Sequence, residues 1–360
     1  MKIIVAKILI LFFTIIPFRL FAEVEFLDHA IPELVVSPRS LGAGNANFGE
    51  DFGPLTVFLN PASRISVVKH KFGLLNFTGE FNSDTFSSTF GSKGLSFDSV
   101  QKGISFLSQS NMRNELIKKD GGILSQRMGV VSFYQFKRFT IGYFSSHFSN
   151  GAMVDADSTY YGNRREDYGP YIHFSSLLSR RLLFGITYVY LTRSETFSTE
   201  NSVASTNQTQ TFHGSSNHVI LALKYKINRK FLASIVSRDA FSSNFFYVGM
   251  EGLPANDPNT VDFAFTWFLS KNRLKLNLGL RDITGKYSDV TSDRKIQFGG
   301  EYSNSMKSGI KFGYLDGGPT LGYFYKTRKR GSYSISTHSV NTKITDVRDE
   351  DRRVTFELSF

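Results

Sequence analysis

The sequence predicts an all-β fold, a 14-stranded antiparallel transmembrane β-barrel with a short N-terminal plug segment. Three observations predict it: an export signal, a series of segments in which apolar and polar side chains alternate, and connections of two alternating lengths. The composition agrees, because 41% of the residues are hydrophobic and the aromatic residues include 36 Phe and 16 Tyr. Outside the N-terminus no run approaches the roughly 20 apolar residues of a membrane helix, which argues against a helical membrane protein.

Residues 1–22 have the pattern of an export signal. Lys2 and Lys7 give a positively charged start, and an apolar stretch continues to Phe18. Cleavage is expected after Ala22. The sequence contains no cysteine, which excludes disulfide bonds, thiolate metal sites and cysteine nucleophiles. Export together with the barrel pattern predicts the bacterial outer membrane, crossed many times.

The alternation is clearest between residues 274 and 281, where four leucines alternate with polar or small residues. Residues 219–227, 261–269 and 295–302 follow the same period of two. Several of these segments are long enough for a tilted strand that crosses a bilayer, which takes about 9–11 residues. A strand with one apolar and one polar face fits a barrel wall between lipid and a wet interior.

The connections between these segments decide between a barrel and a soluble sandwich. Short basic connections recur at Lys137-Arg138, Arg180-Arg181, Asn228 to Lys230, Lys271 to Arg273, Ser303 to Lys307, and Arg328 to Arg330. Longer, polar connections lie between them, at 150–167, 196–212, 240–258, 284–291 and 341–351, with a short one at Asp316 to Gly318. Short turns on one side of the membrane and long loops on the other are typical of outer-membrane barrels.

The short turns also give the number of strands. Six of them join twelve strands between residues 123 and 340, and the segments 70–78 and 352–360 add one each, for 14 in total. An even number places both ends of the barrel on the periplasmic side. The connection from 80 to 122 then becomes a large outer loop, in which rough helical spacing indicates a surface helix. The residues with this spacing are Val100, Ile104, Leu107, Met112, Leu116 and Ile117.

The final segment carries a signal of its own. Its apolar face is formed by Val354, Phe356, Leu358 and Phe360, and its polar face by Arg353, Thr355, Glu357 and Ser359. A terminal Phe that closes an alternating strand resembles the signal read by the outer-membrane barrel assembly machinery, with Phe356, Leu358 and Phe360 as its residues. This machinery and the outer-membrane lipid are therefore predicted partners.

The positive charge has a structural explanation. The formal net charge is +11 at pH 7, and basic residues gather in the short turns. These turns would lie beside anionic headgroups, where each Lys or Arg contributes about 1 kcal/mol. No nucleic-acid recognition motif accompanies the charge, so nucleic acid is not a predicted partner.

The polar faces of the strands are expected to line the barrel interior. If the leucines of 274–280 face lipid, the residues between them face inward, and the same reasoning applies to the neighbouring strands. The candidate lumen-lining residues are Lys224, Asp262, Lys275, Asn277, Arg281, Lys295, Gln297 and Glu301. They predict a polar and rather basic lumen, whose buried charges need water or partners.

The stretch 37–64 carries a motif, in which Arg-Ser-x-Gly-x-Gly is followed by an Asp and then by aromatic-x-Asn-Pro-Ala. The residues of this motif are Arg39, Ser40, Gly42, Gly44, Asp51, Phe58, Asn60, Pro61 and Ala62. The stretch resembles the start of the FadL-type outer-membrane fatty-acid transporters and of their PorV-type relatives. The resemblance implies that residues 23–67 fold into the lumen as a plug and that residues 68–360 form the barrel.

The sequence gives little support for catalysis, so an enzyme is not predicted and neither a cofactor nor a metal site is expected. It lacks Gly-x-Ser-x-Gly, His-Glu-x-x-His and phosphate-loop motifs. A lone Ser-x-x-Lys, at Ser66 and Lys69, has no companion Lys-Thr-Gly. Four histidines are scattered over the barrel region, at His147, His173, His213 and His218.

Three functional hypotheses follow. The first is a FadL-like transporter that passes hydrophobic small molecules across the outer membrane, as the resemblance implies. The second is a PorV-like barrel that does not transport but serves as a platform or shuttle for secreted or surface proteins. The third is a general porin for polar or anionic solutes, which the basic lumen favours. The first is preferred, and the third is the weakest.

Overall fold

The computed structural model describes the chain from residue 33 onward, with short gaps. The described ranges are 33–46, 53–63, 70–91, 97–105, 108–153, 159–201, 206–242, 245–248, 257–269, 273–288, 290–305, 307–327, 331–344 and 347–359. The predicted signal segment and its cleavage near Ala22 lie outside these residues, as do Asp51 and Phe360.

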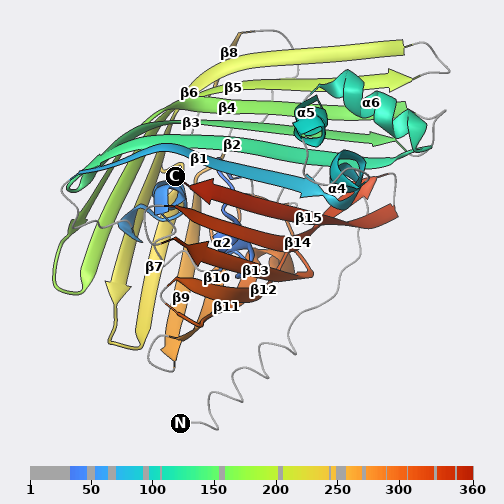
Figure 1. Ribbon diagram of the computed structural model, residues 1–360. Helices are drawn as coiled ribbons and strands as arrows, with labels where there is room; N and C mark the ends of the chain where they lie inside the picture. The colour runs from blue at the N-terminus through green and yellow to red at the C-terminus, as the bar shows by residue number, and fades with distance from the viewer. Residues whose placement is uncertain are drawn as a thin grey trace.

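The protein is built mainly from long antiparallel strands that follow the chain around a ring (Figure 1). The strands are β1 (His70–Asn82), β2 (Gly122–Phe136), β3 (Phe139–Met153), β4 (Thr159–Leu177), β5 (Leu182–Asn201), β6 (Thr206–Lys226), β7 (Phe231–Arg238), β8 (Phe246–Val248), β9 (Thr260–Leu269), β10 (Leu274–Leu280), β11 (Ile296–Ser303), β12 (Ser308–Leu315), β13 (Gly318–Lys326), β14 (Ser332–Ile344) and β15 (Val347–Ser359).

The ring closes where the last strand pairs with the first. In the β1–β15 ladder Gly79 lies opposite Phe356, and every other pair of neighbours is also antiparallel. The three-residue strand β8 pairs only with β6 and stands beside the ring, where β7 has already ended. The other strands form a closed 14-stranded barrel, which confirms the predicted fold class.

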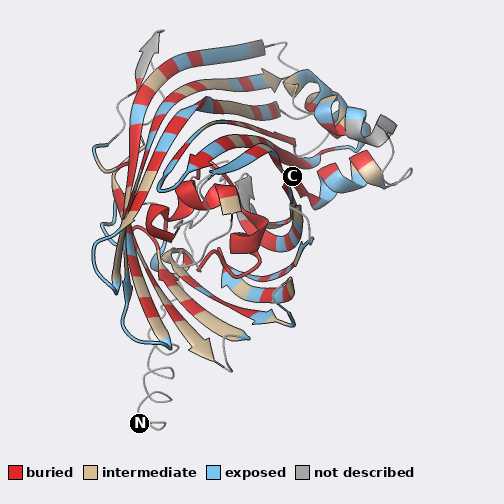
Figure 2. Ribbon diagram, turned by 60° about the vertical axis from the view of Figure 1, so that its left-hand side comes forward, coloured by how far each residue is buried: buried red, intermediate tan, exposed pale blue. Residues whose placement is uncertain are grey.

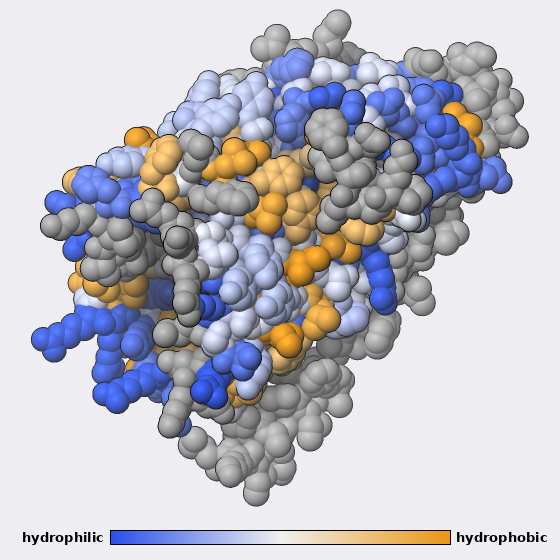
Figure 3. Space-filling view, viewed as in Figure 1, coloured by the Kyte–Doolittle hydropathy of each residue, from blue (hydrophilic) through white to orange (hydrophobic). Residues whose placement is uncertain are grey.

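The side-chain alternation predicted for the wall is confirmed in the final strand. Arg353, Thr355 and Glu357 are buried, whereas Leu358 on the opposite face is 39% exposed. Figure 2 shows the same alternation of buried and exposed residues along most of the strands. On the visible surface, apolar side chains gather over the middle of the barrel and hydrophilic ones dominate its two ends (Figure 3). This is the surface that a barrel presents to lipid.

The prediction of a long loop is wrong for three of the connections. Residues 150–167, 196–212 and 341–351 lie mostly in strands, and β6 alone has 21 residues. A bilayer is crossed by about 9–11 residues, so these strands continue well past the membrane. Beyond the lipid both faces of a strand are wet, and the resulting polar composition resembles that of a loop. Residues 284–291 do form a connection, which ends in α7 (Ser292–Lys295).

The connection from 80 to 122 contains three helices where the apolar spacing predicted one. They are α4 (Ser83–Phe90), α5 (Phe97–Ser105) and α6 (Gln109–Lys118). Met112 and Leu116 of α6 are buried against the strand residues Leu124, Met153 and Tyr160. The helices therefore pack against the outer ends of the strands. Over the described ranges, none of the helices has the length and apolar character required of a membrane-crossing helix.

A separate chain segment fills the inside of the ring, where its buried helical turns are visible in Figure 2. Its elements are α2 (Pro38–Leu41), η1 (Gly53–Leu55), α3 (Thr56–Leu59) and η2 (Pro61–Ser63). The helix α2 contacts β13 and β14, whereas η2 contacts β4, β5 and β6. We call residues 33–46 the first plug segment and residues 53–63 the second plug segment. They lie against opposite walls of the barrel.

Candidate functional site: a plugged lumen with two unlike walls

The first plug segment is fixed by charged and amide side chains. Arg281 of the connection after β10 lies 2.6 Å from the Glu33 carboxylate, which also accepts a hydrogen bond from the Asn45 side chain at 2.9 Å. Asn45 in turn accepts one from the Ser40 hydroxyl at 2.6 Å. All four side chains are buried. This part of the plug is thereby connected to the wall through an ion pair and a short hydrogen-bonded chain.

Two motif glycines bring the plug backbone against the wall. The Thr320 hydroxyl of β13 donates to the carbonyl of Gly42 and accepts from the amide of Gly44, both at 3.1 Å. A Cβ at Gly42 would lie 2.8 Å from the Cα of Gly322, which is too close. At Gly44 the φ angle is +63°, and a Cβ would lie 2.2 Å from the carbonyl oxygen of Phe298. Both positions therefore require glycine.

Arg39, another motif residue of the first plug segment, also contacts the wall. The guanidinium of Arg39 lies 4.6 Å from the ring centroid of Phe324, a cation–π contact. The residue is 8% exposed. Sequence reasoning identified Arg39 as part of a motif, and the structure shows that its contact partner is an aromatic side chain of β13.

The second plug segment is held through its backbone carbonyls. The Thr187 hydroxyl donates to the carbonyl of Val57 at 2.6 Å, and the Arg238 guanidinium donates to the carbonyls of Phe58 and Leu59 at 3.3 and 3.4 Å. The Lys224 ammonium lies 3.3 Å from the Ser63 hydroxyl. These contacts fix the backbone of the segment and leave its side chains to pack.

The Asn-Pro-Ala element forms a compact turn at the end of this segment. The Asn60 side-chain oxygen accepts a hydrogen bond from the backbone amide of Ala62 at 3.1 Å. The backbone amide of Asn60 donates to the Thr56 carbonyl at 2.8 Å. Pro61 and Ala62 then pack directly on the β5 backbone, where a Cβ at Gly185 would lie 2.2 Å from the carbonyl carbon of Pro61. The element thus stops the plug against the wall.

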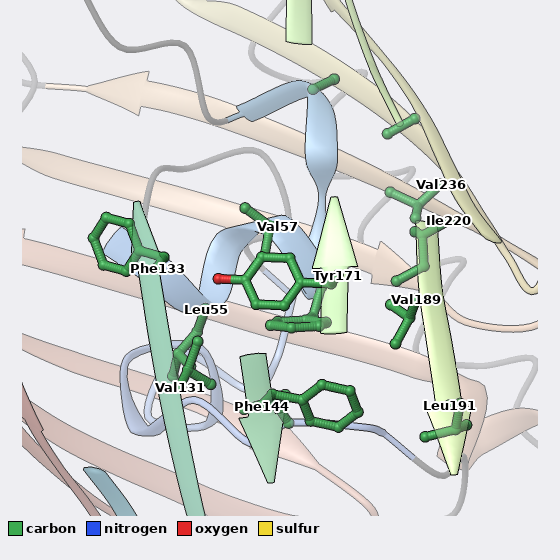
Figure 4. Close-up of a cluster of buried hydrophobic side chains, with 14 of the residues drawn as sticks. Leu55, Val57, Val131, Phe133, Phe144, Tyr171, Val189, Leu191, Ile220 and Val236 are labelled. Atoms are coloured by element: carbon green, nitrogen blue, oxygen red, sulfur yellow. The ribbon is translucent and has the colours of Figure 1, made fainter. Parts of the chain in front are cut away.

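The side chains of the second plug segment pack against apolar side chains of the wall (Figure 4). We call this cluster of buried residues the apolar chamber. These are Val35, Leu55, Val57, Phe58, Ala62, Val131, Phe133, Phe144, Tyr171, Val189, Leu191, Ile220, Ala222, Val236 and Phe245. The ring of Phe58 lies 5.2 Å from that of Phe144 and 4.9 Å, edge on, from that of Tyr171. Chamber residues come from six neighbouring strands, β2 to β7, and from the plug.

The opposite wall carries paired charges. Asp262 of β9 lies 2.6 Å from Arg238 and 2.9 Å from Arg281. Further along this wall Glu301 lies 2.7 Å from Lys311 and 3.3 Å from Lys275. These carboxylates and cations are buried or nearly so, and each charge that the ion pairs include is balanced by a neighbour of opposite sign.

Of the other predicted lumen-lining residues, Asn277 and Lys295 have partners on the inside of the wall. Asn277 accepts a hydrogen bond from Thr266 at 2.8 Å, Lys295 lies 2.8 Å from Asp282, and Gln297 is buried. The structure brings Asp262 and Arg281 together with the first plug segment, and it brings Lys224 to the second. It does not gather all eight into one site.

The predicted polar and rather basic lumen did not include the apolar region that lies inside one side of the barrel. The charged wall agrees with that prediction, whereas the inner face of β2 to β7 carries the apolar residues of the chamber beside buried polar ones such as Arg127 and Arg193. In β2, for example, Val131 and Phe133 point inward while Tyr134 points outward and is 39% exposed. A period of two cannot tell the inside from the outside when both faces are apolar. The consecutive apolar pairs Val130-Val131 and Phe133-Tyr134 in β2 were the signal from which an apolar inner face could have been predicted.

A small cavity lies between the two walls, with a free volume of about 40 Å³. That is room for two or three water molecules. The second plug segment contributes Phe58 and Leu59 to its apolar side, together with Ile220 of β6. Its polar side contains three arginines and a histidine, namely Arg165, Arg193, Arg238 and His218.

Each of these basic side chains already has an acidic partner. Arg165 and Arg193 lie 3.0 and 2.7 Å from Asp167, Arg193 also lies 2.9 Å from Asp257, and His218 lies 3.5 Å from Asp239. Burial alone would raise the pKa of Asp257, but the Arg193 guanidinium outweighs that effect and lowers the pKa to about 2. The polar side of the cavity is therefore neutralised.

The four histidines singled out in the sequence do not form a common site. His147 lies 3.5 Å from Glu166, and His173 contacts the Thr187 hydroxyl at 3.1 Å. His218 belongs to the cavity wall, and His213 lies in the part of β6 that pairs with β8. Within the described part of the chain, no group of three or more His, Asp or Glu side chains has the arrangement of a metal site.

No family model and no curated protein matches the chain. Solved structures do resemble it. The toluene transporter TbuX of Ralstonia pickettii has a TM-score of 0.54 at 10% identity and covers 90% of this chain and 97% of its own. A deltaS2S3 mutant of the monoaromatic hydrocarbon channel TodX gives 0.58 at 12% identity, with 90% and 98% covered. A FadL homologue of Pseudomonas aeruginosa gives 0.50 at 12% identity, with 91% and 98% covered.

These similar structures are transporters and channels rather than enzymes, and they do not support the PorV-type alternative. At such low identities the likeness concerns the fold alone. The chain has the closed, 14-stranded, antiparallel barrel fold of the FadL-type outer-membrane transporters.

Proposed function

We propose that the protein passes hydrophobic small molecules inward across the bacterial outer membrane, after its signal segment has been cleaved near Ala22. The observation that carries the proposal is the apolar chamber, which lies inside the barrel and is formed jointly by the wall and the second plug segment. A barrel that only displayed partner proteins has no need of an apolar interior, and a porin for polar solutes would be hindered by one.

The free energy gained by burying a hydrophobic molecule in such a chamber is large enough to bind it from water. Burying apolar surface contributes about 25 cal/mol per Å², and a single aromatic ring buries roughly 150 Å² or more. The gain is then about 4 kcal/mol for one ring, before the cost of immobilising it. The names of the similar structures, a toluene transporter and a monoaromatic hydrocarbon channel, agree with a substrate of this kind.

The plug favours this function over a general porin. The cavity that the described plug and wall residues leave beside Phe58 has a volume of about 40 Å³, too small for a substrate to pass unless part of the plug moves. An open aqueous channel would show steady conductance in a planar bilayer. The protein is expected to show none beyond brief openings.

Uptake experiments test the proposal. A bacterial strain that lacks its own hydrophobic-compound transporters is given the gene, and the uptake of labelled toluene, naphthalene and dodecanoate is measured. Faster uptake of at least one compound, with unchanged uptake of a sugar, is expected. If the barrel is folded in the outer membrane and none of the three compounds enters faster, the proposal is wrong.

Targeting is part of the same proposal. The alternating final strand, with Phe356, Leu358 and Phe360, is proposed to be read by the barrel assembly machinery. Removal of Phe360 is then expected to reduce the amount of folded barrel in outer-membrane fractions several-fold. Replacement of Ser359 by Thr, which leaves the apolar face intact, is the control and should have no such effect.

A further inference from the structure

The position of Phe58 is unusual for a plug residue. Its ring is 1% exposed and lies between the rings of Phe144 and Tyr171, which belong to two neighbouring strands of the wall. Both separations are in the range of 4.5–7 Å that aromatic pairs prefer. Phe144 and Tyr171, both labelled in Figure 4, thus border a space the size of one aromatic ring, which we call the slot, and the chain fills that space with the ring of Phe58.

The cavity next to this ring enlarges the slot. Phe58 lines the cavity together with Ile220, so removal of the ring would join its volume to the space already present. An apolar cavity of about 150 Å³ is enough to bind benzene in a protein core. The space vacated by the Phe58 ring would itself admit one ring of similar size, and the adjoining cavity, whose far side is charged, would add about 40 Å³ to it.

The charges around the cavity select against an anion. Arg193 is bound by both Asp167 and Asp257, and Arg238 is bound by Asp262. A carboxylate ligand would have to displace one of these buried partners, and breaking a buried ion pair costs about 3–5 kcal/mol. An uncharged ligand meets no such cost.

From these three observations we infer that the Phe58 ring occupies the binding site of an uncharged, single-ring hydrophobic molecule, and that the substrate binds by displacing this ring. The inference rests on the proposed function and specifies its substrate class. The plug backbone need not leave the wall at this step, because the bonds from Thr187 and Arg238 hold the carbonyls of the segment and not the ring.

The test compares ligand affinities of purified barrels in detergent by calorimetric titration with toluene, naphthalene and dodecanoate. Phe58→Ala is expected to bind toluene at least tenfold more tightly than the wild type, because the ligand no longer competes with a resident ring. Its affinities for naphthalene and dodecanoate should change less. Phe58→Trp, which overfills the slot, should abolish toluene binding.

A matched control uses Phe81 of β1, which is 2% exposed but lies on the outer face of the wall, against Phe90 and Phe356. Phe81→Ala removes the same number of atoms outside the lumen and should bind toluene as the wild type does. Heat-dependent migration in gel electrophoresis verifies that each variant is a folded barrel. If Phe58→Ala does not fold, Phe58→Leu replaces it, with an expected gain of a few-fold.

Two results would overturn the inference. One is a folded Phe58→Ala or Phe58→Leu barrel that binds toluene no more tightly than the wild type. The other is an equal gain in Phe81→Ala, since binding would then report only the deleted volume. If cells still take up toluene but the toluene affinity does not change when Phe58 is replaced, this inference is wrong and the proposed function still holds. A tenfold gain without any uptake in cells supports the binding site and removes the transport function.

Discussion

The two walls of the lumen differ in what they offer to the plug. The chamber wall receives the second plug segment by apolar packing, as Phe58 and Val57 show, whereas the charged wall fixes the first plug segment through Glu33 and Arg281. Apolar packing is non-directional and tolerates an exchange of one apolar group for another. A buried ion pair, in contrast, is costly to break at either one of its partners. We therefore propose that the substrate binds at the apolar wall, and that the ion pairs of the charged wall hold the first plug segment in place.

The largest expected effect concerns Asp262. It is fully buried between Arg238 and Arg281, and Asp262→Asn leaves two buried guanidinium groups without their shared carboxylate. Loss of one partner from such a group costs about 3–5 kcal/mol. The urea midpoint of barrel unfolding should fall accordingly. Asp84→Asn, at an exposed site on α4, is the control. An equal midpoint for both variants would refute the role assigned to the charged wall.

A smaller effect is expected on the apolar side. Val189 is fully buried in the chamber, and Val189→Ala removes apolar atoms worth about 2 kcal/mol, including the cavity left behind. The matched position is Val130, in β2, whose side chain points to the outer face and is only half-buried. Val130→Ala should lower the unfolding midpoint less. If the order were reversed, the chamber would not be a packed core.

Acid should weaken the cavity wall by a similar amount. The pKa of Asp257 is about 2 in the folded barrel, against an ordinary value of 3.8, so the unfolded chain binds the proton more readily. Above pH 4 the ionised Asp257 carboxylate therefore adds up to about 2 kcal/mol to the free energy of unfolding. This contribution disappears as the pH falls towards 2. Unfolding of the wild type and of Asp257→Asn, followed from pH 7 to pH 2.5, should converge at the acidic end. Parallel curves would contradict the Arg193–Asp257 pair.

The last expected effect, on conductance, concerns Gly44. Gly44→Ala adds a Cβ that collides with the wall, in a left-handed conformation that alone costs about 1–2 kcal/mol. Gly285 has a similar φ of +67° but open space around it. Gly285→Ala therefore reproduces the backbone strain without the collision. Planar-bilayer recordings should show more frequent openings for Gly44→Ala only, and equal behaviour of both would exclude a loosened plug.

The sequence predicted the barrel and its charged wall because those strands obey a strict period of two. Leucines outside and Asn277 or Arg281 inside leave no ambiguity about which face meets lipid. The chamber wall escaped prediction because Val130 and Val131, or Phe133 and Tyr134, are apolar on both faces. Likewise the wet outer ends of β4 to β6 have the composition of loops, although main-chain pairing with their neighbours keeps them extended.

The plug motif could be recognised in the sequence, but the separate roles of its residues could not be predicted. Its glycines and its Asn-Pro-Ala element serve close backbone contacts that the residue types alone indicate. The task of Phe58 depends on Phe144 and Tyr171, which lie far away along the chain and meet it only after the ring has closed. Long-range partners of this kind leave no trace in a local pattern.

The side chain of Arg238 touches both halves of the lumen, since it binds the carbonyls next to Phe58 as well as the carboxylate that Arg281 shares. We propose that binding of a ligand in the place of Phe58 is coupled through this side chain to the attachment of the first plug segment, and such a coupling would be reciprocal. A remote change such as Glu33→Gln, which touches no ligand, should then shift the apparent affinity for a hydrocarbon. In this proposal the Arg238 guanidinium couples substrate binding in the chamber to release of the first plug segment from the wall.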